Sequence, residues 1–205
     1  MTIARDFDQL CHRLFIWQNY DPAAKTDLFS SAITTCAGIY LVDPIPLEPS
    51  QLPRLREQSP VAGIVVTNAN HQRAATRYSD ELSAPIFAHR DSFPDKKPSR
   101  LAEIENGTKI CDELEVVVID GAVAGEIALY QPPHGGTIVI GDALINFEPY
   151  GFAFLPRKYC ANEKEMRRSL RKLLTRKAER MLFAHGTPIL CGATGRLQKL
   201  LDVDL

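Results

Sequence analysis

The sequence predicts an α/β fold built from short apolar strands and amphipathic helices packed in layers. Brief strand-like apolar runs recur along the whole chain, and helical patterns follow some of them. The chain has 205 residues, of which 45% are hydrophobic and 24% charged, as expected for a globular protein with a sizeable core. No change in composition marks a boundary, so we expect one domain over residues 1–205.

The first part of the chain is predicted to begin with strands and then to alternate strand and helix. Apolar, aromatic or β-branched runs indicate the strands, and a proline-rich link after Pro44 separates the third strand from the next element. The expected elements are, in order, strands at 14–20, 29–35 and 38–42, a short helix at 52–58, a strand at 63–66, a helix at 72–82 and a strand at 86–88.

The second part is predicted to contain three more strands before the clearest helix of the chain. Met166, Leu170, Leu173 and Leu174 have the i, i+4, i+7, i+8 spacing that places side chains on one helix face. The expected elements are strands at 113–119, 126–130 and 137–140, a helix at 163–180, a strand at 181–184 and a helix at 194–201.

Composition also limits the compartment and the partners. The formal net charge is −1, so no global field favours nucleic acid or an anionic membrane. The N-terminus lacks an apolar signal core, and no apolar run approaches the roughly 20 residues of a membrane span. The five cysteines are scattered without a C-x-x-C pair. We therefore expect a cytoplasmic protein with unpaired, mostly buried thiols.

Basic residues crowd the predicted helix at 163–180. They are Lys164, Arg167, Arg168, Arg171, Lys172, Arg176, Lys177 and Arg180. Three glutamates dilute this charge, which favours a solvated amphipathic helix over a nucleic-acid site. Binding that weakens steeply with salt would favour the nucleic-acid alternative.

A polar loop follows the strand at 63–66 and leads into the next helix. Its polar positions include Asn68, Asn70, Gln72 and Arg73. This stretch resembles the place of the H-x-H-x-D-H metal motif in the metallo-β-lactamase superfamily. Three further stretches resemble that family in the same order, namely 38–44, 121–130 with 137–144, and 182–188. The resemblance implies a four-layered αββα sandwich and, in typical members, hydrolysis by metal-bound hydroxide.

The resemblance also implies which positions would bind metal. Asn68, Asn70 and Arg73 stand at the three histidine positions of the loop, and Gln72 stands at its aspartate position. Ala122 stands at a further histidine position, whereas Asp142 and His185 keep the family residues. Two remaining ligands are too few for a tight zinc site, and amide oxygens bind zinc poorly. We therefore expect no metal cofactor.

The new residues at these positions suggest a compensation for the missing charge. A buried carboxylate without a partner is costly. We expect the Arg73 guanidinium to replace the metal as the positive charge beside Asp142, with Glu126 as a further partner. The alternative for Asp142 and His185 is a structural hydrogen-bonded pair.

The predicted function is that of a superfamily member with a degenerate metal site and a non-hydrolytic role in small-ligand binding or structure. The candidate pocket comprises Asn68, Asn70, His71, Gln72, Arg73, Asp142 and His185. Asn, Gln and Arg suit an anionic or carbonyl-bearing small molecule. The alternative is a mononuclear hydrolase of ester or thioester substrates, with one weakly held Zn, Fe or Mn. We expect no nucleic-acid or membrane partner, and a homo-oligomer is compatible with the sequence.

Overall fold

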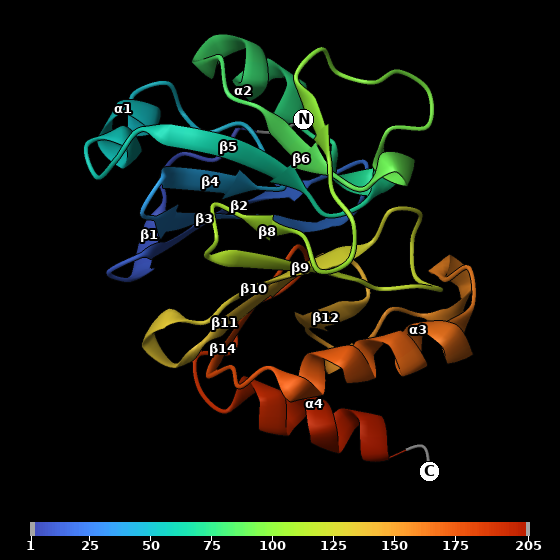
Figure 1. Ribbon diagram of the computed structural model, residues 1–205. Helices are drawn as coiled ribbons and strands as arrows, with labels where there is room; N and C mark the ends of the chain where they lie inside the picture. The colour runs from blue at the N-terminus through green and yellow to red at the C-terminus, as the bar shows by residue number, and fades with distance from the viewer. Residues whose placement is uncertain (1–2, 204–205) are drawn as a thin grey trace. The chain divides into compact units, whose positions relative to one another are not determined.

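The computed structural model describes residues 3–203 and has an α/β fold (Figure 1). The chain divides into two compact units, unit 1 (Met1–Glu103) and unit 2 (Ile104–Leu205). Unit 1 contains a seven-stranded sheet, and unit 2 contains a five-stranded sheet and a two-stranded hairpin. Each unit also has helices, so both sheet layers and both helix layers of the predicted fold are present.

The sheet of unit 1 has its strands in sequence order. They are β1 (Asp8–Cys11), β2 (Leu14–Asp21), β3 (Thr26–Thr35), β4 (Gly38–Val42), β5 (Val61–Val66), β6 (Ile86–Ala88) and β7 (Leu101–Glu103). The first four strands pair antiparallel, and β4 to β7 pair parallel. The carboxyl ends of β4, β5 and β6 therefore meet at one edge, where ligands of open α/β sheets commonly bind.

Two short helices accompany this sheet, α1 (Gln51–Arg56) and α2 (Ala75–Leu82). Tyr78 of α2 is 2% exposed and belongs to the same apolar cluster as Leu41 of β4 and Ile64 of β5. The Tyr78 hydroxyl also accepts a hydrogen bond from the backbone N–H of Leu47 at 2.8 Å. The helix α2 is thus fixed to the sheet by apolar contact and by one buried hydrogen bond.

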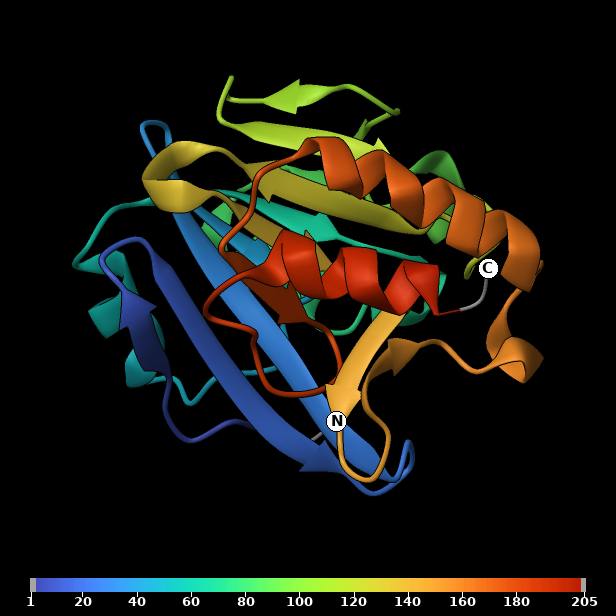
Figure 2. The same cartoon turned by 90° about the horizontal axis from the view of Figure 1, so that it is seen from below.

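The sheet of unit 2 has the strand order β14-β11-β10-β9-β8. Its strands are β8 (Lys109–Ile110), β9 (Leu114–Val118), β10 (Ile127–Gln131), β11 (Thr137–Ile140) and β14 (Arg180–Phe183). Only the pair β11 and β14 is parallel. The helices α3 (Glu163–Leu170) and α4 (Ala193–Asp202) lie across this sheet (Figure 2). Their buried residues, such as Met166 and Leu197, join the apolar cluster of Ile138 and Ile140.

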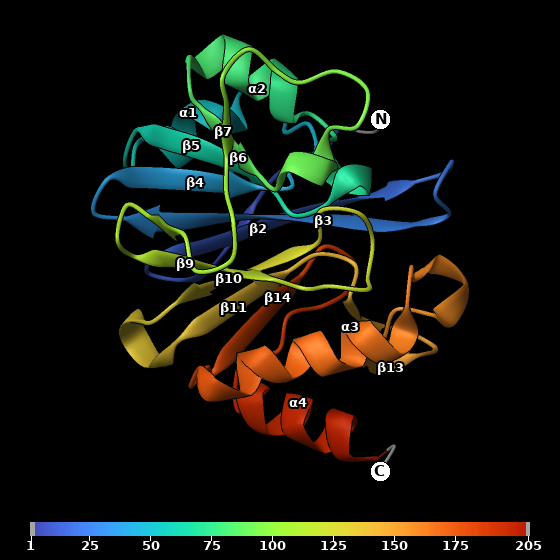
Figure 3. The same ribbon diagram turned by 45° about the vertical axis from the view of Figure 1, so that its right-hand side comes forward.

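The two-stranded hairpin of unit 2 consists of β12 (Leu144–Phe147) and β13 (Gly151–Phe154) and lies beside α3 (Figure 3). The guanidinium carbon of Arg167 on α3 lies 4.4 Å from the centre of the Phe154 ring. Asn146 of β12 forms a bridge to Gly186, which follows β14. The hairpin is thus attached both to α3 and to the segment after β14.

Three predicted strands, at 38–42, 86–88 and 137–140, are confirmed to the residue. The prediction of one helix over 163–180 is wrong. After α3 the chain continues as a 3-10 helix, η5 (Arg171–Thr175), and β14 then begins at Arg180. The Thr175 hydroxyl and the Arg176 guanidinium both donate to the Lys172 carbonyl, at 3.0 and 2.6 Å. These bonds satisfy a carbonyl that a longer helix would have used.

Burial of the cysteines also differs from the prediction. All five thiols are free, as predicted, but Cys11, Cys36 and Cys191 are exposed, and Cys111 and Cys160 are partly exposed. They lie at a strand end or in turns and loops rather than in strand interiors, and of the five only Cys160 packs against an apolar cluster of the described residues. Among residues 3–203, none of the helices has the length and apolarity that crossing a membrane requires.

Candidate functional site

The polar loop of unit 1 begins at the edge where β4 and β5 end. Val42 and Val65 are partners in this parallel pair, so Asp43 and Thr67 follow their strands side by side. The backbone N–H of Asp43 donates to the Val65 carbonyl at 2.9 Å, which continues the pairing beyond β4. Parallel pairing thus brings a carboxylate and a hydroxyl together at the sheet edge.

Asp43 is the centre of a buried hydrogen-bond network. Its carboxylate accepts bonds from the Thr67 backbone N–H at 2.8 Å and from the Thr67 hydroxyl at 2.5 Å. The Nδ1 atom of His71 lies 3.1 Å from the same carboxylate and 3.0 Å from the Thr67 hydroxyl. Asp43, Thr67 and His71 are all at most 2% exposed. His71, which the sequence placed in the candidate pocket, is therefore fixed by a carboxylate 28 residues earlier.

The electrostatics of this network favour the charged carboxylate. Burial by itself would raise the pKa of Asp43, because a carboxylate loses hydration there. The His71 imidazole and the Arg73 guanidinium outweigh burial and hold the pKa below its usual value of 3.8. Asp43 therefore stays ionised, so the network contains a buried negative charge balanced by neighbouring donors.

The polar side chains of the loop bond to neighbouring groups of unit 1. The Asn68 side chain accepts from the Asn70 backbone N–H at 2.9 Å and caps η1 (Ala69–His71), a 3-10 helix. The Gln72 side chain donates to the Ser92 carbonyl at 2.7 Å. These bonds define the shape of the loop and connect it to the segment after β6.

Arg73 is held in a specific backbone and side-chain position. Its φ of 39° lies in the left-handed region, which non-glycine residues adopt only at a cost. Its Nη1 atom donates to the carbonyls of Phe29 at 2.5 Å and Asp43 at 2.9 Å. The guanidinium thus lies close to the buried Asp43 charge. The predicted pairing of Arg73 with Asp142 stays a prediction.

In unit 2, Asp142 and His185 are brought together by strand register. Ile140 of β11 pairs with Phe183 of β14, and each of the two functional residues follows two positions later. The Nε2 atom of His185 lies 3.3 Å from the Oδ1 atom of Asp142. The side chain of Asp142 is 9% exposed and that of His185 is 16% exposed. Asp142 is therefore buried and His185 partly buried, with the imidazole within ion-pair distance of the carboxylate.

Two further contacts hold this pair in place. Glu126 is 1% exposed, and its carboxylate accepts from the Ala143 backbone N–H at 3.0 Å, which fixes the turn that carries Asp142. The His185 carbonyl accepts from the Asn146 backbone N–H at 3.1 Å. Gly186 has φ of 110°, and a Cβ there would lie 2.1 Å from the Asn146 carbonyl oxygen. Only glycine therefore allows this close approach after His185.

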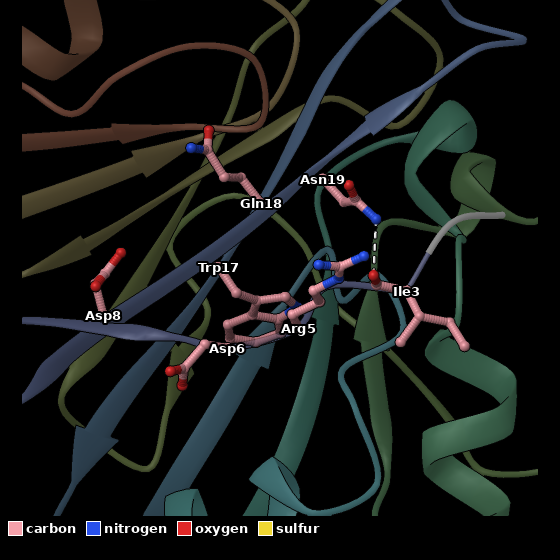
Figure 4. A pocket seen from close by; sticks show the side chains of 7 residues that line it. All are labelled: Ile3, Arg5, Asp6, Asp8, Trp17, Gln18 and Asn19. Carbon is pink, nitrogen blue, oxygen red and sulfur yellow. Dashed lines mark hydrogen bonds between the residues drawn. The ribbon is translucent and has the colours of Figure 1, made fainter.

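A separate hollow of about 530 Å³ lies in unit 1, where β1 diverges from β2 (Figure 4). It is lined by Ile3, Arg5, Asp6, Asp8, Trp17, Gln18 and Asn19. The Asn19 side chain donates to the Ile3 carbonyl at 2.7 Å and closes one end. None of the residues predicted for the candidate pocket lines this hollow.

Sequence reasoning did not identify Asp43 and Thr67 as site residues. Asp43 lies within the resembling stretch 38–44, and Thr67 directly precedes the first polar position of the loop, Asn68. The sequence feature that could have identified them is their position directly after a buried strand. Asp43 follows Gly38–Val42, and Thr67 follows Val61–Val66. Polar residues at the ends of neighbouring parallel strands meet at one edge, which pairs Asp43 with the loop.

Comparison with known proteins identifies the family. A model described as "Metallo-beta-lactamase superfamily" matches residues 10–203. The DIM-1 metallo-beta-lactamase has a similar structure, with a TM-score of 0.75, 15% identity and 97% of each chain covered. A metallo-beta-lactamase from Erythrobacter litoralis gives a TM-score of 0.73 at 17% identity, covering 96% of each chain. A family protein from Thermus thermophilus gives 0.67 at 17% identity, covering 96% of this chain and 80% of that one. No match is found among curated protein sequences.

Proposed function

The chain belongs to the metallo-beta-lactamase superfamily, and from that premise we propose that it has kept the fold but not the binuclear metal centre, and binds a small ligand without hydrolysing it. One observation carries the proposal. Asn68, Gln72 and Arg73 stand where the family resemblance places metal ligands, and their side chains bond to neighbouring protein groups instead. The chemistry of these three side chains and their bonds to protein groups are both evidence against a role as metal ligands.

A binuclear centre does not fit the residues present. Catalytic zinc normally has three protein ligands of imidazole, carboxylate or thiolate type. At the loop positions the chain offers amide groups and a permanently charged guanidinium, which repels a cation. Ligand-type side chains are left at His71 in unit 1 and at Asp142 and His185 in unit 2. The residues present therefore do not support hydrolysis through two metal ions.

The proposed ligand is anionic or bears a carbonyl group. The guanidinium of Arg73 suits a carboxylate or phosphate, and the amides of Asn70 and Gln72 suit a carbonyl group. The two carbonyl contacts of Arg73 hold its side chain in one place, which lowers the entropy lost when a ligand binds. The proposed ligand-binding residues also include the other members of the predicted candidate pocket, namely Asn68, His71, Asp142 and His185.

A thermal-shift titration tests the proposal with inorganic phosphate, citrate and acetyl phosphate as probes. A ligand that binds only the folded chain at 100 times its Kd adds about 2.7 kcal/mol of stability, an easily measured rise in Tm. We expect at least one probe to raise the Tm of the wild type and to leave the Arg73→Gln variant unchanged. Arg77→Gln is the matched control, because Arg77 is half-exposed and pairs with Glu81. Equal shifts in both variants would refute the role of Arg73.

The alternative function is a mononuclear metal-dependent hydrolase of ester or thioester substrates. The distance of 3.3 Å between Asp142 and His185 favours it. Charge-assisted hydrogen bonds are usually 2.7–2.9 Å long, whereas two ligands of one tetrahedral zinc lie about 3.4 Å apart. His71 or a cysteine would have to supply a third ligand, and a bound ion would supply an activated water. One stoichiometric metal ion in protein purified without chelator would support this alternative.

A structural or dimerising protein with an inert pocket is the third candidate. The homo-oligomer left open by the sequence bears on this possibility. Light scattering measures the oligomeric state, and any probe that raises Tm only when Arg73 is intact would count against an inert pocket. The proposed compartment is the cytoplasm, supported by three exposed free thiols, and cell fractionation tests it.

A further inference from the structure

Positive charge is concentrated in one stretch of unit 2. Residues 147–180 contain ten Lys and Arg against four Asp and Glu, whereas the whole chain contains 24 against 25. The near-neutral net charge of the chain therefore conceals a local excess of six positive charges. Such an excess raises the local concentration of anionic partners.

Ion pairs distinguish two groups of four among these ten basic residues, and Lys177 and Arg180 belong to neither group. Four of them have acidic partners within the unit, namely Arg167 with Glu163, Arg171 with Asp202, Lys172 with Asp120, and Arg176 with Glu115. These four hold α3 and η5 in place. They support the sequence interpretation of a solvated amphipathic helix for that part of the chain.

The second group comprises two residues in the segment before α3, Arg157 and Lys158, and two residues of α3, Lys164 and Arg168. Arg157, Lys158, Lys164 and Arg168 are exposed, and within residues 3–203 no carboxylate forms an ion pair with them. Arg157 and Lys164 line a common hollow of about 410 Å³. Lys164 and Arg168 are one helical turn apart and so share a face of α3. The four cations therefore form one continuous surface.

Two exposed aromatic rings belong to the same surface. Tyr150 is 62% exposed and Tyr159 is 58% exposed. The Nζ atom of Lys158 lies 4.7 Å from the centre of the Tyr159 ring. Tyr150 lies in the turn between β12 and β13, with its ring centre 5.6 Å from that of Phe147. We call Tyr150, Arg157, Lys158, Tyr159, Lys164 and Arg168 the basic aromatic surface.

We propose that the basic aromatic surface binds single-stranded nucleic acid. Proteins that bind single strands without sequence preference combine cations for the phosphates with aromatic rings on which bases stack. A membrane surface fits less well, because the highly exposed large apolar residues of 147–180 are both tyrosines, whereas interfacial amphipathic helices insert Trp, Phe or Leu. This proposal departs from the sequence expectation, which rests on the near-neutral net charge of the chain and on the glutamates of the predicted helix.

Fluorescence anisotropy with a labelled oligo(dT) of about 20 nucleotides tests the proposal, since one binding site covers about 4–16 nucleotides. If all four cations contact phosphates, log Kd should change with log salt concentration by about 0.7 per contact, hence by about 3 in total. Arg157→Gln combined with Lys164→Gln should lower this slope by about 1.4. Tyr159→Ala should weaken binding by about fivefold or more and leave the slope unchanged.

The matched control is Lys25→Gln combined with Lys96→Gln, two exposed lysines of unit 1 that remove the same formal charge. This control should keep the wild-type slope, and all variants should keep the wild-type Tm. The proposal is overturned by an absence of oligonucleotide binding at low salt or by an equal loss of slope in the control. Binding to phosphatidylserine vesicles without binding to the oligonucleotide would also overturn it.

Discussion

Replacing Asp43 with Ala is expected to lower the free energy of unfolding by about 3–5 kcal/mol. The substitution removes the acceptor of the Thr67 backbone N–H, the Thr67 hydroxyl and the His71 imidazole. Each buried donor left without an acceptor costs about 1–3 kcal/mol, and breaking a buried ion pair by removing one partner costs about 3–5 kcal/mol. The Asp43 side chain is only 3% exposed, so little water can replace the lost bonds.

Urea denaturation followed by the fluorescence of Trp17 measures this loss, because the chain has one tryptophan and it is buried in unit 1. Asp95→Ala is the control, since Asp95 is exposed and should change stability by less than about 0.5 kcal/mol. Asp43→Asn should cost less than Asp43→Ala, because its carbonyl oxygen can still accept from Thr67. A cost below about 1 kcal/mol for Asp43→Ala would refute the assigned network.

The remaining predictions concern pH, backbone space and the unit 2 pair. Folding lowers the pKa of Asp43, so its contribution to stability is present above the unfolded pKa of about 3.9 and is lost as pH falls through the lower folded pKa. The difference in unfolding free energy between wild type and Asp43→Ala should therefore shrink in that acidic range. Urea titrations at several pH values would contradict this if the difference grew. Gly121→Ala should lower the free energy of unfolding by more than about 2 kcal/mol, because its Cβ would lie 2.4 Å from the Asn162 carbonyl oxygen. Gly107 has nearly the same φ but no atom within 4 Å of such a Cβ, so Gly107→Ala should lower it by about 1 kcal/mol. Equal losses of stability in urea would refute the steric argument. Asp142→Ala should lower unfolding free energy by about 1–3 kcal/mol, because His185 is left partly buried with one partner fewer, and an unchanged urea midpoint would show that their contact contributes nothing.

The strands that sequence predicted to the residue are those with sharp local boundaries. The strand Gly38–Val42 is an apolar run ended by Asp43-Pro44, and Ile86–Ala88 begins directly after Pro85. The hairpin of Leu144–Phe147 and Gly151–Phe154 was missed, because its strands are short and Pro149 interrupts the pattern between them.

The helix at 163–180 was predicted too long for a different reason. Its apolar spacing continues through Leu173 and Leu174, so periodicity alone gives no signal to stop. The chain instead tightens into the 3-10 helix Arg171–Thr175 after Leu170, and Thr175 and Arg176 bond to the Lys172 carbonyl, local contacts that the apolar pattern does not encode.

The candidate site was located by its polar residues, but its internal contacts needed the fold. The resemblance implies Asp142 and His185 only as remaining ligand positions, and strand register explains why they lie together. The link between Asp43 and His71 spans 28 residues and depends on the parallel pairing of β4 with β5, which a single sequence does not specify. Long-range contacts of this kind decide how a loop histidine is oriented.

Metal content is the measurement that tests the central claim most directly. The protein is purified without chelator, equilibrated with zinc, iron and manganese in turn, dialysed and analysed by inductively coupled plasma mass spectrometry. The proposal that Asn68, Gln72 and Arg73 have replaced a binuclear centre predicts less than one ion per chain after dialysis. Two tightly held ions per chain, together with hydrolysis that a chelator abolishes, would contradict it.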